Sequence, residues 1–167
     1  MINDKPHPLP ATILNDEAAT LAYGARFATC LQTGLNVYLH GNLGAGKTTF
    51  VRGVLRGFGY AGKVKSPTYT LVESYELTAE ASLVMKGSRL SIHHFDLYRF
   101  IDEEEWEAAG FREYFNPQSI GLIEWPEKAE RLLPLADIDV RLVILNEARS
   151  IQLSANTALG QQCLTNF

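Results

Sequence analysis

The chain has 167 residues, of which 46% are apolar and 20% are charged, and its formal net charge at pH 7 is −4. This length predicts one domain with one hydrophobic core, and the lack of excess Lys and Arg argues against broad binding to a nucleic-acid backbone. The N-terminus has no apolar signal segment, and no run approaches the roughly 18 apolar residues of a membrane span, so we expect a cytoplasmic protein without a membrane partner.

Proline content and hydrophobic periodicity predict the elements of the first third of the chain. Three prolines in residues 1–10 predict a flexible N-terminal arm, because proline cannot donate a backbone hydrogen bond. Apolar residues then recur at helical spacing, with Asn15 or Asp16 as the N-cap and Gly34 as the stop. The expected elements are a helix between Asn15 and Gly34, a short apolar strand at 36–40 and a helix at 48–59.

Strand patterns dominate the remainder. Residues 69–77 and 89–98 are predicted to form a strand pair with a long connection. The acidic stretch 102–115 predicts a helix, or two short helices broken at Gly110, with Trp106 as the apolar anchor. The other expected elements are a buried strand at 119–124, a short helix at 127–133 and an antiparallel pair at 139–145 and 150–154. This order predicts an α/β fold whose central sheet mixes parallel and antiparallel strands and is flanked by helices.

The chain contains two cysteines, Cys30 and Cys163, far apart in the sequence and without any C-x-x-C pattern. Such spacing does not indicate a metal site, and thiols of a reducing cytosol are rarely paired. We therefore interpret the two cysteines as unrelated free thiols.

The segment Gly-Asn-Leu-Gly-Ala-Gly-Lys-Thr at 41–48 matches the phosphate-loop (P-loop) pattern G-x-x-x-x-G-K-[ST] in full, between an apolar strand and a helix. Glycines permit positive φ, so successive N–H groups can converge on anionic oxygens, and the following helix adds its positive dipole end. Lys47 would reach the β- and γ-phosphates, and the Thr48 hydroxyl would bind Mg²⁺. No N-K-x-D-like guanine signature occurs, which favours ATP. The expected nucleotide ligands here are Gly41, Asn42, Leu43, Gly44, Ala45, Gly46, Lys47, Thr48 and Thr49.

A P-loop needs an acidic residue at the end of a neighbouring strand to hold Mg²⁺. Asp96 ends the segment "LSIHHFD" and Glu124 ends "SIGLIE", although each could also be a solvated carboxylate at a strand end. Thr68 in "SPTYT" lies where nucleotide switches place a hydroxyl that senses the γ-phosphate, although a plain turn also explains the pattern. The adjacent His93 and His94 would face opposite sides of a strand and could not easily share one metal ion.

Four segments together resemble a known family in their order and spacing: "GNLGAGKTTF", "VKSPTYTLVESYE", "HHFDLYR" and "IEWPEK". They resemble the TsaE family, the ATPases of bacterial tRNA threonylcarbamoyladenosine (t6A) synthesis, from about Asn15 to Arg149. The resemblance implies a single-domain P-loop NTPase fold with slow, Mg²⁺-dependent hydrolysis of ATP. It also implies action on the TsaB–TsaD pair, which transfers threonylcarbamoyl to adenosine 37 of ANN-decoding tRNAs, with only indirect contact to tRNA.

The resemblance also implies roles for single residues. Lys47 and Thr48 match the ligands of phosphate and Mg²⁺, and Thr68 matches a switch-like threonine. Asp96 and Glu124 match the two acids of the family. Glu124 is favoured as the ligand of the metal ion and Asp96 as the residue that supports hydrolysis, and both remain candidates for binding the metal. Three further matches are Trp125 beside the nucleotide, Glu17 near the base and Arg149 as a late contact. The implied catalytic set is Lys47, Thr68, Asp96 and Glu124.

Taken together, the prolines, the predicted elements and the resemblance divide the chain into an arm at 1–10, an ATPase domain at 11–154 and an unassigned tail at 155–167. Asn42 stands where the family often has an acid, and the stretch 76–91 is longer than in compact relatives. Two other functions remain open. A small P-loop kinase would need an arginine-bearing lid, for which the scattered arginines and the short chain leave no room. A nucleotide-gated binding module without turnover is the third interpretation.

Overall fold

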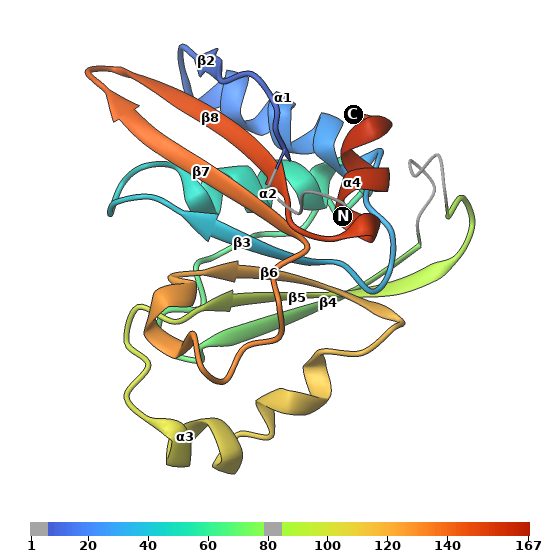
Figure 1. The fold of residues 1–167 in the computed structure, drawn as a ribbon, viewed down its shortest axis with the longest axis vertical. Coiled ribbons are helices and arrows are strands. Elements are labelled where there is room, and N and C mark those ends of the chain that lie inside the picture. The colour runs from blue at the N-terminus through green and yellow to red at the C-terminus, as the bar shows by residue number, and fades with distance from the viewer. Residues whose placement is uncertain (1–6, 79–84) are drawn as a thin grey trace, which may run out of the picture.

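A computed structural model describes residues 7–78 and 85–167 (Figure 1). Within these ranges eight strands form one sheet in the order β1-β8-β7-β3-β6-β5-β4, and β2 pairs with β8. The strands are β1 (His7–Pro8), β2 (Thr12–Leu14), β3 (Asn36–His40), β4 (Val72–Thr78), β5 (Arg89–Asp96), β6 (Ser119–Glu124), β7 (Ile138–Leu145) and β8 (Ala148–Ala155). The central pairs β5–β6, β6–β3 and β3–β7 are parallel, while β4 and β8 pair antiparallel with their neighbours. The mixed α/β sheet expected from the sequence is confirmed.

Helices cover both faces of this sheet (Figure 1). The helices α1 (Glu17–Ala28), α2 (Lys47–Gly57) and α4 (Ala158–Thr165) pack on one face around a core that includes Phe27 and Phe50. On the other face lie α3 (Glu103–Ala108) and the 3₁₀ helices η1 (Phe111–Tyr114) and η2 (Pro126–Ala129), around Phe95 and Trp106. No helix within the described residues is long and apolar enough to cross a bilayer.

The first helix begins as expected and ends early. The Asp16 side chain caps α1 by accepting a hydrogen bond from the Ala19 N–H at 2.8 Å. The helix ends at Ala28, before the predicted Gly34, where the Thr29 hydroxyl donates to the Arg26 carbonyl at 2.7 Å. This local hydrogen bond competes with continuation of the helix.

Helices α1 and α2 approach each other closely at two glycines. A Cβ atom on Gly24 would lie 2.5 Å from the Phe50 carbonyl oxygen, and one on Gly53 would lie 2.4 Å from the Leu21 carbonyl oxygen. Side chains at these positions would force the helices apart. The close contact fixes α2, and with it the P-loop at its N-terminus, against α1.

We therefore expect Gly53→Ala to destabilise the fold by about 1–3 kcal/mol, the usual cost of overpacking, because a backbone oxygen cannot move aside cheaply. Urea unfolding measures this as a lower midpoint with an unchanged slope. Arg56→Ala, at an exposed position of the same helix, is the control and should change stability by less than about 0.5 kcal/mol. Equal stability of the two variants would contradict the close-packing argument.

The N-terminal end differs from the sequence-based expectation, and the tail that the sequence left unassigned contains a helix. Residues 1–6 of the predicted arm lie outside the described residues, but His7 and Pro8 pair with β8, and the Leu9 N–H donates to the Leu153 carbonyl at 2.8 Å. Proline tolerates such an edge strand because its missing N–H can face away from the partner. The unassigned tail contains α4, capped by Thr157, whose hydroxyl oxygen accepts from the Gly160 N–H at 3.1 Å.

The two cysteines are free thiols, as expected, but the interpretation that they are unrelated is wrong. Cys30, just after α1, and Cys163 on α4 are each about 1% exposed, and their Sγ atoms lie 3.0 Å apart. The hydrogen bond with Cys30, together with burial, raises the pKa of the Cys163 thiol. The pair therefore joins α4 to the end of α1 inside the core.

Other boundaries shift by a few residues. The strand predicted at 69–77 begins only at Val72, and the one predicted at 89–98 ends at Asp96. The acidic stretch forms two short helices broken at Gly110, whose φ is +67°, and the helix predicted at 127–133 is only the 3₁₀ turn η2. Part of the long connection, residues 79–84, lies outside the described residues.

Candidate functional site

Three parallel strands end at the same edge of the sheet, and each carries residues of the candidate site. The P-loop follows β3, Asp96 ends β5 and Glu124 ends β6, with Asp96 directly opposite Glu124 in the pairing register. Ligands of open α/β sheets bind in the crevice outside such carboxyl ends. The topology therefore brings together the loop and both candidate acids from distant parts of the sequence.

The P-loop turns into α2 through glycines with positive φ, +80° at Gly44 and +101° at Gly46. Lys47 starts the helix and is only 5% exposed. Its Nζ donates to the carbonyl oxygens of Gly41 and, at 3.1 Å, of Asn42. Burial lowers the pKa of the Lys47 amine, while the nearby carboxylates of the site act in the opposite direction.

Trp125 forms the wall beside this lysine. Lys47 Nζ lies 4.2 Å from the centroid of the indole ring, an arrangement that is favourable for a cation. Trp125 has a φ of +56°, a conformation that side chains rarely adopt, between Glu124 and the 3₁₀ helix η2. The strained backbone aims the ring at the P-loop, as is common for residues of functional sites.

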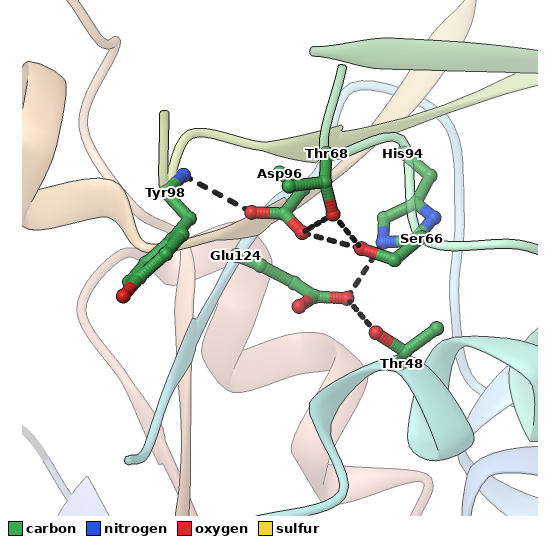
Figure 2. Close-up of polar contacts among 7 residues, drawn as sticks. All are labelled: Thr48, Ser66, Thr68, His94, Asp96, Tyr98 and Glu124. Atoms are coloured by element: carbon green, nitrogen blue, oxygen red, sulfur yellow. Dashed lines mark hydrogen bonds and ion pairs between the residues drawn. The ribbon is translucent and has the colours of Figure 1, made fainter. Parts of the chain in front are cut away.

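Glu124 connects the P-loop helix to the sheet (Figure 2). It is 3% exposed, and its Oε1 accepts a hydrogen bond from the Thr48 hydroxyl at 2.8 Å. His94 Nε2 lies 2.8 Å from the same oxygen. The carboxylate is thus buried and held by two donors from different elements.

Asp96 holds the loop that precedes β4 (Figure 2). The Ser66 hydroxyl and, at 3.2 Å, the Thr68 hydroxyl donate to Oδ2, and the Tyr98 N–H donates to Oδ1 at 3.0 Å. The loop closes on itself where the Leu71 N–H donates to the Pro67 carbonyl at 2.7 Å, with Leu71 at a φ of +65°. The Asp96 carboxylate therefore holds the loop by accepting hydrogen bonds from two of its hydroxyls.

Removal of both hydroxyls in the double variant Ser66→Ala, Thr68→Ala should loosen this loop in the nucleotide-free protein. Hydrogen bonds to a charged group contribute about 1.5–3 kcal/mol, so we expect amide hydrogen exchange of the Leu71 N–H to accelerate at least about tenfold. Thr70→Ala is the control, because Thr70 lies in the same loop and contacts Glu73 instead of Asp96. Unchanged exchange in the double variant would show that the hydroxyls do not hold the loop.

The oxygen atoms of Thr48, Asp96 and Glu124 suit a hard cation such as Mg²⁺. Within residues 7–78 and 85–167, no group of three or more His, Cys, Asp and Glu side chains is arranged to hold a metal ion by itself. Mg²⁺ is usually bound by one or two carboxylates together with substrate phosphates and water, and rarely by an all-protein cage. The residues present therefore fit Mg²⁺ that arrives with a phosphorylated ligand.

A pocket of about 510 Å³ gathers most of the predicted residues. It is lined by Leu43, Gly44, Ala45, Gly46, Lys47, Thr48, Thr49, Ser66, Thr68, Asp96, Tyr98, Arg99, Glu124 and Trp125. Gly41 and Asn42 lie outside it and contribute the carbonyls that accept from Lys47. The volume lies within the range of small-molecule sites.

Glu17 and Arg149 lie in a smaller adjoining pocket of about 160 Å³, which shares Gly44, Gly46 and Thr49 with the first. Arg149 reaches the P-loop from β8, where its Nη2 donates to the Gly44 carbonyl at 3.1 Å. Glu17 pairs with Arg52 at 3.3 Å on the exposed side of α1 and α2. Glu17, expected near the base, and Arg149, expected as a late contact, thus line the same pocket beside the P-loop.

Sequence reasoning missed four residues around the site: Ser66, His94, Tyr98 and Arg99. The signal for His94 was available, because it lies two positions before Asp96 in a strand and therefore on the same face. Its neighbour His93 faces the opposite side, as expected, where its ring bonds Ser74 at 2.8 Å and packs edge-on against Tyr114.

The fold and the site together define a protein of the P-loop NTPase fold class: a phosphate loop between a central parallel strand and a helix, with acids at the ends of the neighbouring strands. The family model described as "Threonylcarbamoyl adenosine biosynthesis protein TsaE" matches residues 14–151. The chain therefore belongs to the TsaE family.

Relatives and solved structures agree with this assignment. The chain is 47% identical over 157 residues to the tRNA threonylcarbamoyladenosine biosynthesis protein TsaE of Haemophilus influenzae, covering 91% of this chain and 93% of that one. It is 37% identical to the TsaE protein of Rickettsia felis, covering 93% of this chain and 84% of the relative. The crystal structure of Bacillus subtilis YdiB superposes with a TM-score of 0.72 at 25% identity and covers 96% of this chain and 94% of YdiB.

Proposed function

We propose that the protein binds ATP with Mg²⁺, hydrolyses it slowly and acts on the TsaB–TsaD complex in the threonylcarbamoylation of adenosine 37 in ANN-decoding tRNAs. The observation that carries the proposal is the convergence of Lys47, Thr48, Asp96 and Glu124 on one pocket at the carboxyl ends of three parallel strands. Membership of the TsaE family, and the names of the relatives, support the role in t6A synthesis.

Phosphate binding is the role of the P-loop in this proposal. Lys47 exchanges its hydrogen bonds to the Gly41 and Asn42 carbonyls for bonds to the β- and γ-phosphate oxygens, which are stronger acceptors because they are charged. The N-terminus of α2 adds backbone N–H groups and a positive dipole end. Glu17 and Arg149, in the adjoining pocket, would contact the base side of the nucleotide.

Thr48 and Glu124 would hold the metal ion, and Asp96 is the second acidic candidate. Bound Mg²⁺ would neutralise phosphate charge and orient oxygen atoms. The Thr48 oxygen would turn a lone pair to the ion while its hydroxyl proton remains hydrogen-bonded to Glu124. Asp96, which lines the same pocket, would orient the attacking water, and Thr68 would then be free to contact the γ-phosphate.

The loop at 66–71 would transmit the state of the nucleotide. The hydroxyls of Ser66 and Thr68 in this loop donate to Asp96, so a ligand that engages Asp96 or Thr68 changes how the loop is held. Its Tyr69 side chain is 84% exposed and is therefore available to a partner protein. The energy of hydrolysis would in this way alter the contact with TsaB–TsaD, without any transfer to a metabolite.

The test combines binding and product analysis. Purified protein is mixed with TsaB and TsaD, with and without ATP and Mg²⁺, and the complex is followed by size-exclusion chromatography while free phosphate is measured. We expect a nucleotide-dependent complex and slow release of phosphate. A phosphorylated metabolite in place of free phosphate would indicate a kinase, and a complex that never releases phosphate would indicate a binding module without turnover.

A further inference from the structure

His94 is the one fully buried histidine among the described residues, and neither the P-loop pattern nor the paired acids explain it. It lies on β5, two positions before Asp96, with its ring directed toward Glu124 (Figure 2). Nε2 lies 2.8 Å from Glu124 Oε1, the same oxygen that accepts from the Thr48 hydroxyl at 2.8 Å.

The register of the sheet explains how His94 reaches Glu124. In the parallel pair β5–β6, Asp96 is opposite Glu124 and His94 is opposite Leu122, one pleat further from the edge of the sheet. His94 therefore approaches Glu124 from the interior, whereas Thr48 approaches it from α2. Two donors from different elements fix the position of a single carboxylate oxygen.

The surroundings of the His94 ring indicate that its hydrogen bond to Glu124 explains why a histidine occupies this buried position. Within the described ranges no group pairs with Nδ1, which is buried. The contact with Glu124 places the ring proton on Nε2, because the carboxylate can only accept. A buried ring nitrogen without a partner costs free energy, so an apolar side chain would suit the core better unless the bond to Glu124 has a role.

We propose that His94 is a positioning residue for Glu124. With Oε1 occupied by His94 and Thr48, the other oxygen of the carboxylate is the one left for the pocket, where a metal ion or its bound water would be held. This inference rests on the proposed function, in which Glu124 helps to bind Mg²⁺. Such outer partners of a metal site orient the groups that do the binding.

Three substitutions separate positioning from simple packing. His94→Gln keeps an N–H donor close to the position of Nε2. His94→Asn carries the same amide on a side chain that is one methylene shorter, so that its donor falls short of Glu124. His94→Leu has a similar size and no donor at all.

The measurements are thermal unfolding without nucleotide, ATP affinity in EDTA, ATP affinity in excess Mg²⁺, and kcat and KM for phosphate release. We expect His94→Asn and His94→Leu to retain the affinity measured in EDTA. In both variants, the increase in ATP affinity that Mg²⁺ causes should be about 10- to 100-fold smaller than in the wild type, and kcat should fall by a similar factor. This is the usual effect of removing an outer partner of a metal site. His94→Gln should retain most of both.

A double-mutant cycle provides the control. In a Glu124→Gln background, His94→Leu should cause no further loss of the Mg²⁺ effect, because the carboxylate it positions is gone. Three results would overturn the proposal. The first is a His94→Gln variant that loses as much of the Mg²⁺ effect as His94→Leu, and the second is a folded His94→Leu variant with a normal Mg²⁺ effect. The third is a double variant whose loss of the Mg²⁺ effect equals the sum of the losses, in free energy, of the two single variants. If His94→Asn and His94→Leu do not fold, His94→Gln decides. A folded His94→Gln variant that has lost the Mg²⁺ effect contradicts the proposal, and one that keeps the effect supports the proposal. A wild-type protein without Mg²⁺-dependent ATP binding would instead contradict the proposed function itself.

Discussion

Lys47→Ala should abolish measurable ATP binding. The lysine is 5% exposed, starts the P-loop helix and donates to two backbone carbonyls of its own loop. Removing one side of a buried charge pair costs about 2–5 kcal/mol, which corresponds to an affinity loss of roughly 30-fold to several thousandfold. Isothermal titration calorimetry with ATP and Mg²⁺ measures the loss, and multiple-turnover tRNA modification with TsaB and TsaD should fail in parallel.

Lys63→Ala is the matched control for this variant. Lys63 is exposed and lies outside the main pocket, so its substitution changes the net charge by the same amount without touching the P-loop. It should bind ATP like the wild type. Normal tRNA modification by Lys47→Ala would contradict the proposed function, whereas loss of binding in both variants would point to long-range charge effects instead of a phosphate site.

The parts of the site that the sequence predicted are those that local pattern determines. The P-loop follows from eight consecutive residues. Asp96 and Glu124 follow from the ends of two apolar runs, because parallel strands place their carboxyl ends at one edge. What could not be predicted is which strand lies beside which, and the contact between His94 and Glu124 depends on the pairing of β5 with β6.

The failures have the same physical origin. Cys30 and Cys163 meet only because α4 folds back onto α1, and no local pattern encodes that contact. The α4 helix itself is short, and its cap, Thr157, was the one local signal that could have revealed it. The end of α1 was misplaced because Leu31 is buried and continues the helical periodicity although it lies in the turn after the helix. Apolar periodicity indicates which residues are buried, and a residue such as Leu31 can be buried without being part of a helix.

Glu124→Gln should impair hydrolysis far more than it impairs nucleotide binding. Glutamine keeps the size of the side chain and an oxygen that can accept from Thr48 and His94, so the nucleotide-free fold should be retained. It removes the negative charge that Mg²⁺ requires and replaces one carboxylate oxygen by a donor. Loss of one preorganised electrostatic contact of this kind lowers kcat by about 10²- to 10³-fold. Phosphate release under saturating ATP measures it, together with ATP affinity in EDTA, which should not change.

Asp96→Asn distinguishes the two acids. Both carboxylates are buried at the same edge of the sheet, at 4% and 3% exposure, so a general loss of negative charge would affect both variants alike. Glu124 contacts the Thr48 hydroxyl, whereas Asp96 contacts the loop hydroxyls of Ser66 and Thr68. Glu124→Gln should therefore shift the Mg²⁺ concentration needed for half-maximal activity, and Asp96→Asn should lower kcat with little change in that concentration. If Asp96→Asn instead shifts the Mg²⁺ requirement and Glu124→Gln does not, the metal belongs to Asp96, because removing the charge of the carboxylate that binds the ion weakens its binding directly.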